Sequence, residues 1–329
     1  MLLKQRKRFI AAVILVAVCS LLAIGQETTG ANRDPEKVRF ATSDIDNFWK
    51  AYDLAAKESD RERKVTIFQT EYLDKGSVGL KDFLRLRIGS ANTLVKAIEL
   101  RPKFYASIRT PTQRVGRMIG KMRTSFRKFK KIYPEAVFPD VYFLIGVANS
   151  GGTTGKTTLL IGTEMYGRTP QTPLDELSTW LKSVLSGTDK LPAIVAHESC
   201  HINQSFQVPQ TLLAKAVQEG SCDLISELIA GDIINTVQKT YGDAHEADLW
   251  REFQAEMNTG SVDKWMYNGS TVKDKPADLG YYIGYRITSE YYRRAKNKMQ
   301  AVREILNIQD LTKFVAESGY NGHNYRGGG

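Results

Sequence analysis

The segment His197-Glu198-Ser199-Cys200-His201 decides what fold we expect, because it sets two histidines four residues apart inside an apolar stretch. On a helix, residues with this spacing project from one face about one turn apart, so both imidazoles can reach one metal ion. The apolar residues at positions 194–196 and 202 would bury the opposite face of the helix. The segment therefore predicts a buried helix that carries a metal site.

An acidic pair follows on the next predicted helix. Glu219 lies 18 positions after His201 and four positions before Asp223. The two carboxylates would share a helical face, so one can bind a metal while the other orients a ligand. Two histidines and one carboxylate leave the fourth position of a catalytic zinc site open for water. Together the two segments predict Zn²⁺ as the cofactor.

The order His-Glu-x-x-His, then Glu-x-x-x-Asp, is similar to the pattern of the gluzincins, the thermolysin-like zinc metallopeptidases. The likeness covers about residues 192–230. It implies that His197, His201 and Glu219 bind zinc and that Asp223 is the partner of His197. It also implies that Glu198 is the general base that takes a proton from water, and that the substrate is a peptide or protein.

A wider likeness includes the segments 219–225, 265–269, 279–285 and 318–320. These resemble the C-terminal half of a bacterial family of predicted zinc-dependent proteases that is related to gliding-motility lipoproteins. The resemblance implies a fold and a class of protein, and no particular substrate.

Gluzincins generally stabilise the oxyanion with a tyrosine or histidine from the C-terminal part of the domain. The candidates in this chain are Tyr281, Tyr282, Tyr285 and His245. We expect Tyr282 or Tyr285 to have this role, ahead of His245. The alternative for each tyrosine is a ring packed in the core of a helix whose glycines allow close approach.

The N-terminus has the parts of an export signal. Basic residues at positions 4–8 precede an uncharged run from Phe9 to Gly25. This predicts a signal peptide over residues 1–25 and an exported protein that is periplasmic, secreted or membrane-anchored and facing outward. The alternative is an uncleaved membrane anchor, because 17 such residues approach the length of a bilayer span. Lipid attachment at Cys19 is disfavoured because Val18 stands where a small residue is needed.

The formal net charge is +10, and the densest basic stretch runs from Arg114 to Lys131. Its apolar residues recur every three or four positions, which predicts an amphipathic helix with a solvated basic face. A nucleic-acid stripe is the alternative, but exported proteins seldom meet nucleic acid. We therefore expect no nucleic-acid partner.

The rest of the chain predicts an α+β fold that is mostly helical and zincin-like, with a small β-sheet ahead of the metal-binding helix. Strands are expected at 141–147 and 159–163 as a hairpin-like pair, joined by a Gly/Thr-rich loop at 149–158. One strand would be an edge that binds extended peptide, with the loop at the rim of the cleft. Helices are expected within 44–99 and at 192–206, 211–230, 244–257, 280–298 and 301–308.

The expected organisation is a signal peptide at 1–25, a helical region at 26–135 and a zincin-like catalytic region at 136–329. A single continuous domain over 26–329 is the alternative, and residues 26–130 could be a prodomain. The sequence leaves open the oligomeric state and whether Cys200 and Cys222 form a disulfide.

These observations predict an exported zinc-dependent hydrolase, most simply a peptidase that cleaves amide bonds. A non-peptidase zinc hydrolase would share the metal site and differ in the pocket. A catalytically silent envelope, adhesion or motility protein is the rival from another class. The presence of Glu198 argues against a silent protein, because zinc binding alone does not need it.

Overall fold

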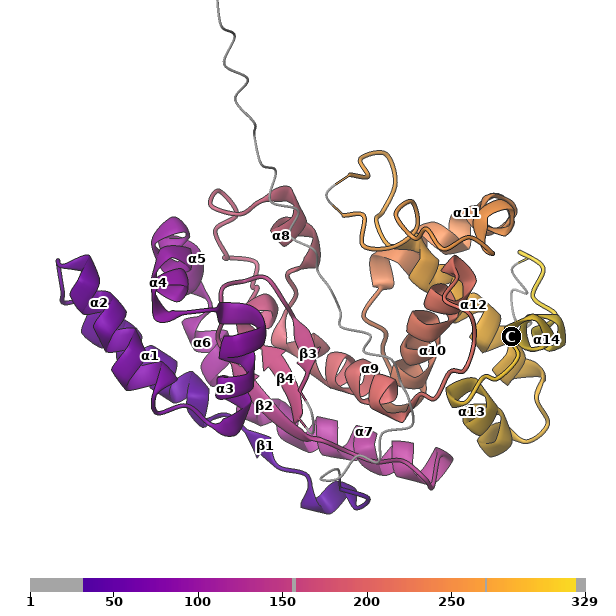
Figure 1. Ribbon diagram of the computed structural model, residues 1–329, viewed down its shortest axis with the longest axis horizontal. Coiled ribbons are helices and arrows are strands. Elements are labelled where there is room, and N and C mark those ends of the chain that lie inside the picture. The colour runs from indigo at the N-terminus through magenta and orange to yellow at the C-terminus, as the bar shows by residue number, and fades with distance from the viewer. Residues whose placement is uncertain (1–31, 156–157, 270, 324–329) are drawn as a thin grey trace, which may run out of the picture.

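The computed structural model describes residues 32–155, 158–269 and 271–323 (Figure 1). The predicted signal peptide at 1–25 lies outside the described residues. Helices surround a small four-stranded sheet, so the expected α+β, mostly helical fold class is confirmed. Of the helices in the described ranges, none has the length and apolar character needed to cross a membrane.

Three of the N-terminal helices begin at polar caps. Asp60, Ser77 and Ser90 each accept a hydrogen bond from a backbone amide in the first turn that follows. Phe48 lies among the rings of Trp49 and Tyr72, which join these helices into one core. The helices are α1 (Ser43–Ala55), α2 (Arg61–Phe68), α3 (Val78–Phe83), α4 (Ala91–Leu100), α5 (Pro102–Ser107) and α6 (Arg109–Gln113).

The sheet has the order β1-β2-β4-β3. Three strands are parallel, and β3 runs antiparallel to β4 at one edge. The central strands are apolar and buried, as expected when helices cover both faces. The strands are β1 (Phe40–Ala41), β2 (Asp140–Leu144), β3 (Gly152–Thr154) and β4 (Thr158–Gly162).

The predicted pairing of 141–147 with 159–163 as a hairpin is wrong. Strands β2 and β4 are parallel, and the hairpin is formed by β3 and β4. The region 149–158, expected to be a loop, contains β3. Three Gly/Thr residues are too few to show the alternation by which a strand is recognised in sequence.

The five helices predicted after the basic stretch are present as α9 to α13, whereas α8 and α14 were not predicted. Helix α11 begins eight residues earlier than expected, and α12 ends four residues earlier. In α7, Met122, Phe126 and Phe129 are buried while Lys121 and Lys128 are exposed, so the predicted amphipathic helix is confirmed. The helices are α7 (Ile119–Ile132), α8 (Thr179–Val184), α9 (Leu191–Asn203), α10 (Leu212–Ala230), α11 (Thr236–Glu256), α12 (Leu279–Arg294), α13 (Lys298–Leu306) and α14 (Leu311–Ser318).

Helices α10 and α12 lie in close contact because glycines face each other. A Cβ at Gly220 would overlap the backbone of Tyr285, and one at Gly284 would overlap the backbone of Ala216.

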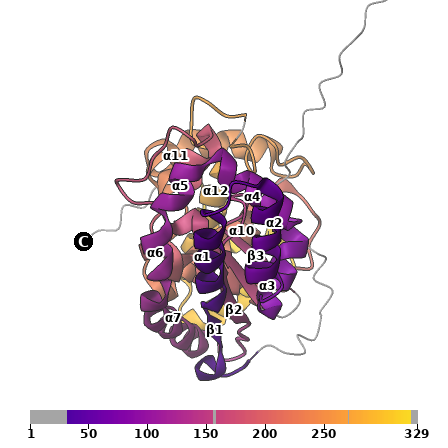
Figure 2. The ribbon, with the colours of Figure 1, turned by 90° about the vertical axis from the view of Figure 1, so that its left-hand side faces the viewer.

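The cores on the two sides of the predicted boundary at 135 are joined. Strand β1 pairs with β2 across it, and one cluster of buried side chains runs from Val38 to Leu306. Figure 2 shows the N-terminal helices in front of the C-terminal ones.

Glu164, directly after β4, is a carboxyl group buried without a counter-ion. Its Oε1 accepts a hydrogen bond from the amide of Ala148 at 3.1 Å, and Oε2 has no hydrogen-bond partner among the described residues. Burial raises the pKa of Glu164 from its usual 4.5 to about 7.

We expect this carboxyl to make stability depend on pH. Between the unfolded and folded pKa values only the folded state keeps the proton, so the free energy of unfolding should fall as pH rises from about 4.5 to about 7. The loss should be at most about 3 kcal/mol. Glu164→Gln cannot titrate and should remove this slope in urea unfolding at about pH 5 to about pH 8. Glu62→Gln, whose side chain is 84% exposed, is the control and should keep it. An unchanged slope in Glu164→Gln would contradict the assignment.

Candidate metal centre

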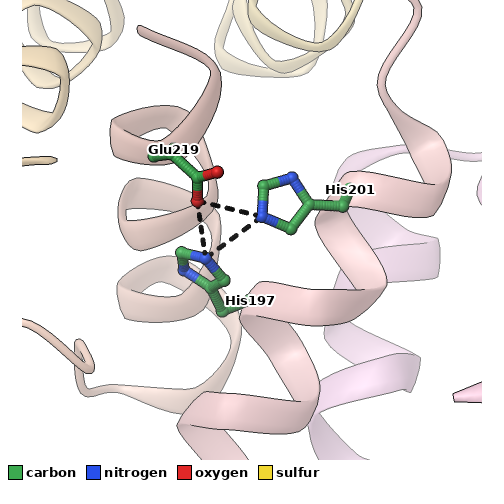
Figure 3. A group of neighbouring side chains, drawn as sticks. All are labelled: His197, His201 and Glu219. Carbon is green, nitrogen blue, oxygen red and sulfur yellow. Dashed lines mark hydrogen bonds and ion pairs between the residues drawn. The ribbon is translucent and has the colours of Figure 1, made fainter. Parts of the chain in front are cut away.

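Three potential ligand atoms converge between α9 and α10 (Figure 3). Nε2 of His197 lies 3.2 Å from Nε2 of His201. Oε2 of Glu219 lies 3.4 Å from the first nitrogen and 3.2 Å from the second. His197 and Glu219 are buried, whereas the side chain of His201 is 15% exposed, so the cluster opens on the His201 side.

The outer nitrogen of His197 is held by Asp223. Nδ1 lies 3.0 Å from Oδ1 of Asp223, and Asn235 donates to Oδ2 of the same carboxylate at 2.8 Å. Because a carboxylate only accepts, we assign the proton to Nδ1 of His197. Nε2 is then left with a lone pair that faces Glu219.

The outer nitrogen of His201 is held in the same way by Gln204, which the sequence reasoning missed. Nε2 of Gln204 donates to the carbonyl of Gln218 and to Oγ of Ser221, both at 2.7 Å. This fixes the orientation of the amide, so its Oε1 must be the atom that accepts from Nδ1 of His201 at 3.0 Å. In their neutral forms both histidines therefore present Nε2 lone pairs to the same point.

The electrostatics of this point favour a positive charge. Burial lowers the pKa of His197, but Asp223 and Glu219 overcome it and raise that pKa well above its usual value. At His201 burial again lowers the pKa, but the negative charge of Glu219 outweighs burial and raises the pKa of His201 to about 9. Burial raises the pKa of Glu219, but the two imidazoles outweigh burial and lower that pKa. Two nitrogens and one carboxylate oxygen are a donor set that fits zinc.

Glu198 lies outside this set, beside the edge of the sheet. A Cβ built on Gly152 of β3 would be 2.5 Å from Oε1 of Glu198, so the carboxylate lies against the strand backbone. Burial, followed by the charge of Glu198, raises the pKa of Tyr166, which places that ring near the same carboxylate. The hydroxyl of Tyr166 also lies against Gly151.

The structure does not bring the preferred tyrosines or His245 to the cluster. The hydroxyl of Tyr282 donates to Asp243 on α11. That of Tyr285 donates to Glu227, about two turns beyond Glu219 on α10. Nδ1 of His245 lies 2.8 Å from a backbone carbonyl of its own helix.

Two other tyrosines lie beside the cluster. The ring of Tyr281 stacks on His197 with centroids 6.5 Å apart, and the hydroxyl of Tyr267 lies 3.4 Å from Oε1 of Glu219. Burial, followed by the charge of Glu219, raises the pKa of Tyr267, and the nearby side chain of Tyr281 lowers it. Tyr267 has φ of +57°, which a bulky residue seldom adopts, and such conformations concentrate at functional sites.

Cys200 and Cys222 are both buried and are free thiols. Burial, followed by the neighbouring thiol of Cys200, raises the pKa of Cys222, so the two thiols lie close together. Its sulfur also lies 3.4 Å from Nδ1 of His201, so the thiol pair lies directly behind one ligand of the cluster.

The fold and site define an α+β protein with a buried His-His-Glu cluster shared by two helices. A family model described as "Gliding motility protein GldB" matches residues 33–322, and the chain belongs to this family. The predicted relation to gliding-motility proteins is thereby confirmed. Searches of the curated proteins and of the solved structures found no match.

Proposed function

We propose that the protein is an exported zinc-dependent hydrolase, and specifically a peptidase with a zincin-like site. The observation that carries this is the orientation of His197 and His201. Each donates its Nδ1–H to a fixed acceptor, so each neutral imidazole directs an Nε2 lone pair at Glu219. This buried arrangement requires a positive charge between Glu219 and the histidines, which either protons on the imidazoles or a bound metal ion can supply.

A zinc ion held by His197, His201 and Glu219 would act as a Lewis acid and lower the pKa of a coordinated water. Glu198 would accept the proton of an attacking water, because its carboxylate is near enough to His201 to affect the pKa of that imidazole and is not one of the three ligand groups. The hydroxyl of Tyr267 lies 3.4 Å from Glu219 and the ring of Tyr281 stacks on His197, so these tyrosines are the candidates to donate to the oxygen on which negative charge develops.

The edge of the sheet supports a peptide as the substrate. Strand β3 is the last strand of the sheet, so an extended chain could pair with its backbone. Gly152 has no side chain at the point where β3 meets Glu198, which lets the carboxylate of the proposed base lie directly against the edge strand. Thr153 is held by a hydrogen bond from Arg87, which steadies the strand.

The family description favours a second candidate, a part of the gliding-motility machinery that has no catalytic activity. In that role the protein would be exported and membrane-anchored, and its partners would be other proteins of the machinery. The two candidates differ in whether the cluster binds a metal and whether Glu198 is needed.

Metal content separates the candidates. The purified full-length protein should hold about one zinc per chain after reconstitution, measured by elemental analysis. His197→Ala and Glu219→Ala should lose most of it because each removes a ligand. His245→Ala and Glu252→Ala are matched controls outside the cluster and should keep it. A wild-type protein that binds no zinc would contradict the proposed hydrolase and leave the motility role.

A further inference from the structure

The first residues that the structure describes lie against α7. Asn32 pairs with Phe138 through two backbone hydrogen bonds of 2.8 Å. Arg123 of α7 donates to the carbonyls of Pro35, Glu36 and Val38. The apolar run from Phe9 to Gly25 ends seven positions before Asn32. Since seven residues span at most about 25 Å, a membrane that holds the apolar run must lie within that distance of the N-terminal end of the fold.

One face of the helical segment beside these residues is basic. Lys121 and Lys128 are seven residues apart and Lys131 follows three later, so these exposed side chains lie on one side of α7. Within the part of the chain that the structure describes, none of them forms a salt bridge. By contrast, Arg127 on the adjoining side is neutralised by Glu36. The basic face consists of Lys121, Lys128 and Lys131.

Few acidic groups offset this charge. Asp189 is one acidic residue near this face, because it borders the same surface pocket as Lys121 and Lys128. Asp232 also borders this pocket, but it is paired with Lys190. The charge of the basic face is therefore available to an external anion.

We propose that the apolar run from Phe9 to Gly25 remains as an uncleaved membrane anchor and that the basic face of α7 contacts the anionic lipid headgroups of that membrane. The tether brings this face within reach of the surface, and its charge is complementary to acidic lipids. Figures 1 and 2 both show α7 at the lower edge of the molecule and α11 at the upper edge, so this contact turns α11 away from the membrane. The proposal does not depend on the metal centre.

The test measures partitioning of the full-length protein onto vesicles of phosphatidylcholine alone and of phosphatidylcholine with phosphatidylglycerol. The apolar run contributes to both, so the ratio of the two partition coefficients reports the charge-dependent part. Each basic residue at an anionic surface strengthens binding about fivefold. Lys121→Glu with Lys128→Glu should lower the ratio by at least about 25-fold and leave binding to the neutral vesicles unchanged.

The matched control is Lys57→Glu with Lys96→Glu, which reverses two exposed charges on the N-terminal helices. It should keep the wild-type ratio, and higher salt should lower the ratio of the wild type. A ratio near one in the wild type, or an equal fall in both double variants, would overturn the proposal. Circular dichroism confirms that each variant is folded.

Discussion

Replacing Glu198 by glutamine is expected to abolish hydrolysis while leaving the metal in place. Glutamine has nearly the same size, but it cannot accept a proton from water. Loss of a general base lowers the rate by about 10²–10⁴-fold. The carboxylate lies against Gly152 and outside the His-His-Glu cluster, so zinc content should not change.

The measurement is kcat/KM on a library of fluorogenic peptides, with zinc determined on the same samples. Glu62→Gln, on an exposed turn of α2, is the control and should behave as the wild type. If Glu198→Gln hydrolyses the same peptides at the wild-type rate, this carboxylate is not the base. If it loses both zinc and activity, its role lies in holding the site.

The His-His-Glu cluster could be predicted from sequence because its geometry is mostly local. Four-residue spacing on a helix puts His197 beside His201, and the same spacing relates Glu219 to Asp223. The only long-range step is the packing of α9 against α10, which buried apolar faces favour. The expected helices matched for the same reason, since their periodicity is contained in the segment itself.

The tyrosines could not be predicted because their places depend on which face of α12 meets α10. Tyr281 and Tyr282 differ by about 100° around the helix axis, and the contact between Gly220 and Gly284 sets the rotation. That contact turns Tyr281 toward His197 and Tyr282 toward α11. Tyr267 lies in an irregular loop, where no periodic pattern indicates the direction of a side chain.

Replacing Gln204 by leucine is expected to weaken zinc binding by about 10–100-fold. In the wild type the amide oxygen accepts from Nδ1 of His201 and keeps the proton off Nε2. Leucine cannot accept, so His201 can carry its proton on Nε2 and must lose it before binding metal. Competition with a chelator measures the affinity, and Gln207→Leu, at an exposed position on the same loop, is the control.

A general loss of packing would also weaken binding, and Gln204→Glu distinguishes the two causes. Its carboxylate can still accept from His201, but it can no longer donate to the carbonyl of Gln218. We therefore expect Gln204→Glu to lose stability toward urea and to keep an affinity for zinc near that of the wild type. If both variants lose affinity in proportion to their loss of stability, Gln204 supports the fold and does not set the tautomer of His201. Only the tautomer explanation predicts that affinity and stability separate, because it assigns them to different atoms of one amide.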